Sequence, residues 1–268
     1  MASNRQMTKN DPDDSALRLA VLIDADNAQA AVIEALLAEI ARFGEATVRR
    51  IYGDFTSPQS KSWKEVLQKY AIKPVQQFAY SKGKNATDST LIIDAMDLLY
   101  TRKFDGFCLV TSDSDFTGLA MRLREEGLTV MGFGAEKTPE AFKNACHKFI
   151  FTEVLGPAPP QKPAPAPARK AGAKRRPSEA PVKEQPKPQP DFPKDFVLTA
   201  LEQSSDDTGW ANLGTFGNYL NKLQPDFDSR TYGFRKLSDL VKAKHDLFET
   251  EERVAPGTHN KHLYVRAK

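Results

Sequence analysis

Cysteine and histidine are scarce in this sequence, which holds two cysteines and four histidines among 268 residues. Two cysteines are too few for a disulfide framework, and Cys108 lies in the apolar run GFCLVT, where a buried free thiol is expected. His147 is the only histidine before residue 157, which argues against a Ser-His-Asp triad or a histidine-rich zinc site in that part. So little cysteine fits the reducing cytoplasm.

Long hydrophobic runs are also missing. The apolar stretches have the length of strands and fall short of the roughly 20 residues that a membrane helix needs. The first residues, MASNRQMTKNDPDDSALR, are polar and lack the apolar core of a signal peptide. With 40% hydrophobic and 27% charged residues, the sequence predicts a soluble, cytoplasmic protein without a membrane partner.

Two glycine-rich phosphate-binding loops are absent as well. The sequence contains no GxxxxGK[ST] loop, and no GxGxxG motif follows the first predicted strand. Nucleotide binding of these two types is therefore unsupported.

What the sequence does have is a proline-rich segment between two regions of ordinary composition. Residues 157–190 contain 11 of the 18 prolines, no aromatic residue, and 8 Lys and Arg against 2 Asp and Glu. We expect a flexible linker, because such a composition cannot bury enough apolar surface to fold. Its basic cluster RKAGAKRR either solubilises the tether or holds a polyanionic backbone loosely. A disordered N-terminus is expected over residues 1–17.

Residues 18–156 alternate between strand and helix patterns. This alternation predicts an α/β fold, a parallel sheet with helices on both faces, in which ligands bind at the carboxyl ends of the strands. The strands are expected at 18–24, 46–54, 72–80, 106–112 and 128–134, and the helices at 28–44, 61–70, 88–103, 116–127 and 138–147.

Aspartates stand at several of these strand ends. Asp24 and Asp113 each terminate an apolar strand, so we expect them to converge and to be functional. Other acids have simpler explanations. Helix caps or first-turn positions account for Asp26, Asp88 and Asp115, a turn accounts for Asp54, and solvated helix positions account for Asp94 and Asp97.

Carboxylates from separate strand ends suit Mg²⁺ or Mn²⁺, which take oxygen ligands and keep several waters. Such a metal can orient water and stabilise phosphate charge during in-line displacement. The segment DADNA also resembles the DxDx[TV] loop of haloacid-dehalogenase phosphatases, but Asn27 and Ala28 depart from that pattern. A metal phosphatase therefore remains a lesser alternative.

Three blocks carry a more specific resemblance: VLIDADN, KNATDSTLIIDAMDLL, and LVTSDSDF followed by LREEGLTVMGFG. In this order they resemble the NYN domain, a branch of the PIN-like superfamily of metal-dependent nucleases, over roughly residues 18–155. The resemblance implies cleavage of RNA phosphodiesters by activated water with Mg²⁺ or Mn²⁺.

The resemblance also implies residue roles. Asp24, Asp88 and Asp113 would bind the metal and be catalytic, and Asp115 would assist them. Near this site, substrate contacts are expected from four residues, which are Asn27, Ser112, Lys82 and Lys84. For the two lysines, an ordinary solvated loop is an equal alternative to phosphate contact.

Residues 191–268 read as three helices followed by a hairpin, which is the plan of a winged helix-turn-helix. The string GWANLGTFGNYLNKLQPDFDSRTYGFRKLSDLV resembles the LOTUS (OST-HTH) domain, which implies RNA binding or a protein partner. Nucleic-acid contacts are expected on the third helix, at Arg230, Tyr232, Arg235 and Lys236. A partly solvated helix with Tyr232 in the core is the alternative.

Together these features predict a metal-dependent ribonuclease to which the C-terminal domain recruits single-stranded or structured RNA. The main alternative is a non-catalytic RNA-binding adaptor, in which the acids hold a structural metal or none.

Overall fold

The structure is a computed structural model that describes residues 16–56, 61–77, 86–155, 190–254 and 261–268. Lys82, Lys84 and almost all of the predicted linker lie outside these ranges. The chain divides into two compact units, one built mainly from residues before 157 and the other mainly from residues after it. We call them the N-terminal and the C-terminal unit and describe each by itself.

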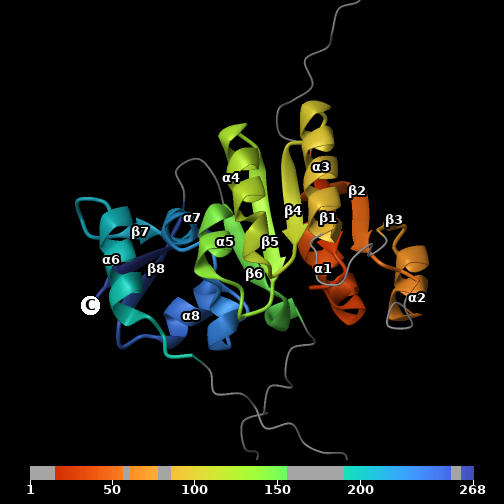
Figure 1. Cartoon of the computed structure of the whole chain (residues 1–268). Helices are drawn as coiled ribbons and strands as arrows, with labels where there is room; N and C mark the ends of the chain where they lie inside the picture. The colour runs from red at the N-terminus through yellow and green to blue at the C-terminus, as the bar shows by residue number, and fades with distance from the viewer. Residues whose placement is uncertain (1–15, 57–60, 78–85, 156–189, 255–260) are drawn as a thin grey trace, which may run out of the picture. The chain divides into compact units, whose positions relative to one another are not determined.

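A six-stranded, fully parallel sheet forms the centre of the N-terminal unit, with the strand order β3-β2-β1-β4-β5-β6. Figure 1 shows this order running from β3 on the right towards β6. The strands are β1 (Leu17–Asp24), β2 (Gly44–Gly53), β3 (Lys73–Gln76), β4 (Gly106–Val110), β5 (Thr129–Gly134) and β6 (Lys148–Phe151).

Helices cover both faces of this sheet, as the α/β prediction requires. Alternate side chains of β1 enter two separate cores: Leu19, Val21 and Ile23 one, Ala20 and Leu22 the other. The first core is completed by α1 (Ile33–Ile40) and α2 (Lys61–Lys69). The second is completed by α3 (Ala86–Tyr100), α4 (Thr117–Glu125) and α5 (Glu140–Ala145).

The strand order fixes where a ligand can bind. After β1 the chain builds β2 and β3 on one side and then returns to build β4 on the other, so the order reverses between β1 and β4. Ile23 is paired in register with Val110. The residues that follow these two therefore emerge side by side at the carboxyl edge, where open α/β sheets bind ligands.

Two elements of this unit differ from the sequence prediction. The helix expected over 28–44 is shorter: a 3-10 turn, η1 (Ala30–Val32), precedes α1, and Gly44 already begins β2. Gly44 lies so close to β1 that a Cβ atom there would come within 2.2 Å of the Leu17 carbonyl oxygen. The edge strand β6 was not predicted, because its four residues, KFIF, carry too short a pattern.

The C-terminal unit has helices on one antiparallel sheet with the order β7-β9-β8. Its core includes Val197, Leu201, Phe216, Leu240, Phe248 and Val265. The elements are α6 (Lys194–Ser204), β7 (Ala211–Asn212), α7 (Leu213–Leu223), η5 (Ser229–Tyr232), α8 (Leu237–Ala243), β8 (Phe248–Val254) and β9 (Lys261–Ala267).

The expected third helix of this unit is broken. Gly233 has a φ of 86° and ends η5 in the left-handed region, which glycine tolerates better than other residues. The prediction that Arg235 and Lys236 lie on a helix is therefore wrong: both precede α8, with Lys236 as its N-cap residue.

Among the described residues, no helix combines the length and the apolar character that crossing a membrane requires.

Candidate metal centre

Asp24 ends β1 with a fully buried carboxylate. Its Oδ1 accepts a hydrogen bond from the Asp26 backbone amide at 3.0 Å. Its Oδ2 accepts from Asn27 Nδ2 at 2.7 Å and from Thr111 Oγ1 at 2.9 Å. These donors replace water around the buried group and hold both of its oxygens in fixed directions.

The turn after β4 presents the next acids. Asp113 is the N-cap residue of η3 (Ser114–Phe116), and its Oδ1 accepts from the Asp115 backbone amide at 2.9 Å. The Asp113 amide in turn donates to Thr111 Oγ1 at 3.1 Å. Thr111 thus links Asp24 at the end of β1 to Asp113 after β4. The sequence prediction missed this threonine; its only signal is its place directly after the apolar run.

Asp88 completes the group from the first turn of α3. Asp88, Asp113 and Asp115 each offer a carboxylate oxygen, and these oxygens lie within 4.8 Å of one another. We call these three residues the acid cluster. Asp115, to which the resemblance gave only an assisting role, belongs to this cluster. Asp24 is not one of the three residues, and its carboxylate accepts hydrogen bonds from Asn27 and Thr111.

The electrostatics of Asp88 show how closely the acids are gathered. Burial raises its pKa to about 6, and the nearby charges of Asp24, Asp113, Asp115 and Asp26 act in the same direction. A cation at this position would relieve that repulsion, because it favours the ionised carboxylates.

Asp26 does not cap a helix, since Gln29 holds the N-cap position of η1. Its pKa is raised by burial and by the charges of Asp24 and Asp54, so it is a further member of the acidic edge. Asp54 has the predicted turn role: its Oδ1 accepts from the Thr56 amide at 3.0 Å and from Gln76 Nε2 at 2.9 Å.

Of the four expected substrate contacts, two can be placed. Asn27 is exposed, but its amide group is directed to Asp24. Ser112 Oγ accepts from the Ala135 amide at 2.8 Å, so it joins the ends of β4 and β5. Lys82 and Lys84 lie outside the described residues, and their contact with substrate stays a prediction.

Asp94 is not a solvated helix position, contrary to the sequence interpretation. Its carboxylate forms an ion pair with Arg50 and accepts a hydrogen bond from Tyr52 Oη, both from β2. Tyr52 is fully buried and is paired in register with Asp24. The contacts of Asp94 with Arg50 and Tyr52 therefore hold α3, which carries Asp88, against β2 next to Asp24.

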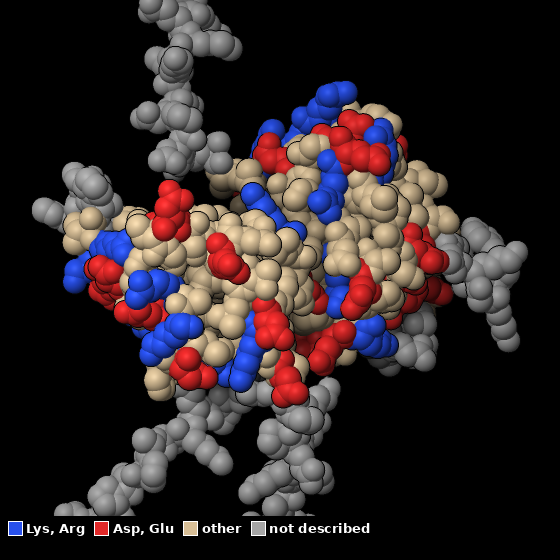
Figure 2. Space-filling view, turned by 90° about the vertical axis from the view of Figure 1, so that its left-hand side faces the viewer, with Lys and Arg blue, Asp and Glu red and all other residues tan. Residues whose placement is uncertain are grey.

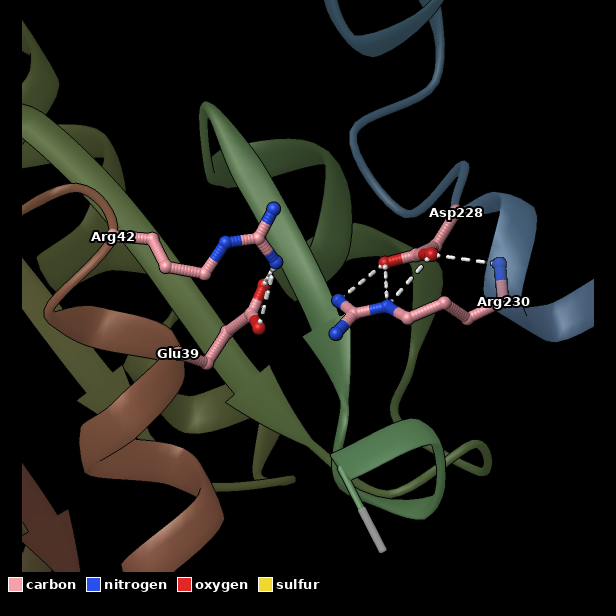
Figure 3. A network of polar contacts seen from close by, with 4 residues as sticks. All are labelled: Glu39, Arg42, Asp228 and Arg230. Atoms are coloured by element: carbon pink, nitrogen blue, oxygen red, sulfur yellow. Dashed lines mark hydrogen bonds and ion pairs between the residues drawn. The ribbon is translucent and has the colours of Figure 1, made fainter. Parts of the chain in front are cut away.

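The candidate RNA contacts of the C-terminal unit are placed differently from one another. Arg230 is turned to the buried carboxylate of Asp228, with Nη2 2.7 Å from Oδ2 (Figure 3). Tyr232 packs edge-to-face on Phe192, at 5.5 Å between ring centroids. Arg235 and Lys236 are exposed.

Solved structures similar to this chain include proteins from three organisms. A protein from Nitrosomonas europaea is 64% identical, with 36% of this chain and 91% of that chain covered and a TM-score of 0.30. A protein of unknown function from Vibrio parahaemolyticus is 16% identical, with 52% and 94% covered and a TM-score of 0.44. One from Chromobacterium violaceum is 31% identical, with 31% and 87% covered and a TM-score of 0.24. No curated protein matches.

Family comparisons give a clearer result. The OST-HTH/LOTUS domain matches residues 189–259, and the NYN domain matches residues 18–153, which make up half of the chain. Residues 18–153 contain the parallel sheet and its acidic carboxyl edge. The chain belongs to the NYN domain family, and an OST-HTH/LOTUS domain follows the NYN domain.

Proposed function

We propose that this protein is a metal-dependent ribonuclease whose site is the acid cluster at the carboxyl edge of the parallel sheet. The observation that carries the proposal is the gathering of Asp88, Asp113 and Asp115 within 4.8 Å, beside the buried Asp24. Membership of the NYN family supports a nuclease, since NYN domains belong to a nuclease superfamily.

The donor set fits a hard divalent cation. It offers carboxylate oxygens and includes no described histidine or cysteine, which matches Mg²⁺ or Mn²⁺ better than zinc. Asp88, Asp113 and Asp115 would hold the ion, with Asp24 beside them. When bound, such an ion supplies an activated water and neutralises charge on the phosphate.

Hydrogen bonds within the protein hold the acids of this site in position. Asn27 and Thr111 fix the direction of the Asp24 carboxylate through hydrogen bonds. Arg50 and Tyr52 hold Asp94 and with it the helix that carries Asp88. Because the pKa of Asp88 is raised to about 6 in the metal-free protein, cation binding would release a proton from it at or below about pH 6.

RNA would be recruited by the C-terminal unit, since LOTUS domains bind RNA. Figure 2, which views the left-hand side of Figure 1, shows basic and acidic side chains interspersed over the face in view. Recognition is therefore expected to depend on individual contacts, with Arg235 and Lys236 as exposed candidates. A domain that binds RNA on the same chain raises the substrate concentration at the nuclease site.

The test is cleavage of a labelled single-stranded RNA by the full-length protein with Mg²⁺ or Mn²⁺. EDTA and the Asp113→Asn variant should each abolish cleavage. Asp97→Asn, which changes an exposed aspartate of α3 outside the cluster, should leave it intact. Cleavage that persists both in EDTA and in Asp113→Asn would refute the proposed site. A DNA strand of the same sequence tests the preference for RNA.

The same assay separates the alternatives. An adaptor would bind RNA without cleaving it, and the charge reversals Arg235→Glu and Lys236→Glu would weaken that binding. A phosphatase would hydrolyse p-nitrophenyl phosphate with the metal and leave the RNA intact.

A further inference from the structure

A small pocket on the carboxyl edge of the sheet includes two residues that bind Asp24. Its volume is about 140 Å³. It is formed where η1, the ends of β4 and β5, and η4 (Thr152–Leu155) come together. The lining residues used below are Asn27, Val32, Val110, Thr111, Phe133 and Glu153.

The pocket and the acidic site share two walls. Asn27 and Thr111 line the pocket, and both donate hydrogen bonds to the Asp24 carboxylate. The pocket therefore lies beside Asp24, next to the site at which we propose that the phosphate is held.

The chemistry of the walls identifies the kind of group that fits. Val32, Val110 and Phe133 give the pocket an apolar part beside its polar residues, and none of the residues that line it is basic. A second phosphate would find no positive charge here. A flat, uncharged ring would bury its faces against the apolar walls, as ligands of small pockets do.

Glu153, an exposed residue that lines the pocket, has a carboxylate that accepts two hydrogen bonds from the protein. Glu153 Oε1 accepts from the Glu136 backbone amide at 3.0 Å, and Oε2 accepts from Thr152 Oγ1 at 3.3 Å. Each oxygen keeps a further lone pair for a ligand, since a carboxylate has about four acceptor sites. The ligand edge that faces Glu153 must therefore carry donors.

We infer that this pocket selects the base of the nucleotide next to the cleaved bond and that it prefers guanine. The inference rests on the proposed nuclease function. Guanine presents two adjacent donors, N1–H and N2–H, that match the two oxygens of Glu153. Adenine would place its N1 acceptor against the carboxylate, and cytosine its N3 acceptor. Uracil offers a single donor between two carbonyl groups. A site built to hydrogen-bond one edge rejects bases that lack it.

Binding can be measured without catalysis. GMP, AMP, CMP and UMP are titrated into the full-length protein by calorimetry. We expect GMP to bind roughly tenfold tighter than the others, since hydrogen bonds to a charged group are at stake. Glu153→Gln should remove that preference, because one acceptor oxygen becomes a donor. Val32→Phe should weaken the binding of all four by filling the pocket, with thermal unfolding to confirm that the variant folds.

The control is Glu65→Gln, which changes an exposed glutamate of α2 that does not line the pocket. It should keep the preference for GMP. Equal affinities for the four nucleotides, or a preference that survives Glu153→Gln, would overturn the inference.

Cleavage of a randomised RNA, with the cut ends sequenced, separates this inference from the proposed function. Cuts next to guanine that lose their bias in Glu153→Gln support both. Cuts without any base bias overturn the pocket and leave the nuclease standing. Absence of cleavage together with selective GMP binding overturns the nuclease and leaves a guanine-binding pocket.

Discussion

The carboxyl edge of the N-terminal sheet and the surface of the C-terminal unit arrange charge in opposite ways. At the edge, carboxylates lie close together, and burial, together with the charges of the neighbouring acids, raises the pKa of Asp88. In the C-terminal unit, several acids form ion pairs with basic residues, such as Asp228 with Arg230 at 2.7 Å and Glu251 with Arg253 at 3.0 Å. Gathered like charges destabilise a fold unless a cation offsets them, whereas paired charges do not. The comparison contrasts the acids of the proposed metal site, which lie together, with acids of the C-terminal unit that are paired with basic residues.

The largest effect is expected from a substitution within the acid cluster. Asp113→Asn should lower the rate of metal-dependent RNA cleavage by about 100-fold or more, since a metal ligand supports several kcal/mol of transition-state stabilisation. Single-turnover kinetics at saturating Mn²⁺ measure it. A rate within a few-fold of the original protein would show that Asp113 is not a ligand.

The next prediction concerns Asp94, an acid that forms an ion pair in the same unit as the acid cluster. Asp94→Asn should lower the free energy of unfolding by about 1–3 kcal/mol, because Arg50 loses its charged partner and Tyr52 its charged acceptor. Urea unfolding measures this change. Asp97→Asn on the same helix should change stability by less than about 0.5 kcal/mol. Equal effects of the two variants would mean that the contact with β2 does not stabilise α3.

Substitution of Asp88 should change stability in the opposite direction to Asp94→Asn. Its pKa in the folded protein, about 6, lies above its ordinary value, so the fold favours its protonated form. Its contribution to stability is present at low pH and is lost as the pH rises through about 6. In EDTA, Asp88→Asn should therefore raise the melting temperature at pH 7 by a few degrees and flatten its fall between pH 4 and 6.

Mn²⁺ provides the control for this prediction. It should stabilise the original protein at pH 7 and leave Asp88→Asn nearly unchanged, because stabilisation follows binding to the folded state. A variant that is less stable than the original protein in EDTA would contradict the repulsion described here.

The smallest effect is expected in the C-terminal unit. Glu251→Gln removes one partner of an exposed ion pair with Arg253, and such pairs contribute little. The melting temperature should fall slightly, opposite in sign to the change in metal-free Asp88→Asn. A rise would mean that acids in the two regions act alike.

Part of this picture follows from the sequence alone. Alternating strand and helix patterns predicted the α/β fold, and acids placed directly after apolar strands predicted where Asp24 and Asp113 meet. Such inferences succeed because local periodicity fixes the elements, and parallel strands bring their carboxyl ends to one edge. The three acidic blocks also indicated the NYN family that the comparisons show.

Other features were decided only by the tertiary structure. Thr111 reaches Asp24 across 87 residues of sequence, and Asp94 reaches Tyr52 across 42. No local pattern encodes these contacts, because strand order and register determine which side chains face each other. The same holds for Gly44, whose place in β2 depends on the closeness of β1. The sequence by itself determined most of the elements of the N-terminal unit and which of their ends carry acids. The packing of those elements decided which acids stand together and which are neutralised by a partner.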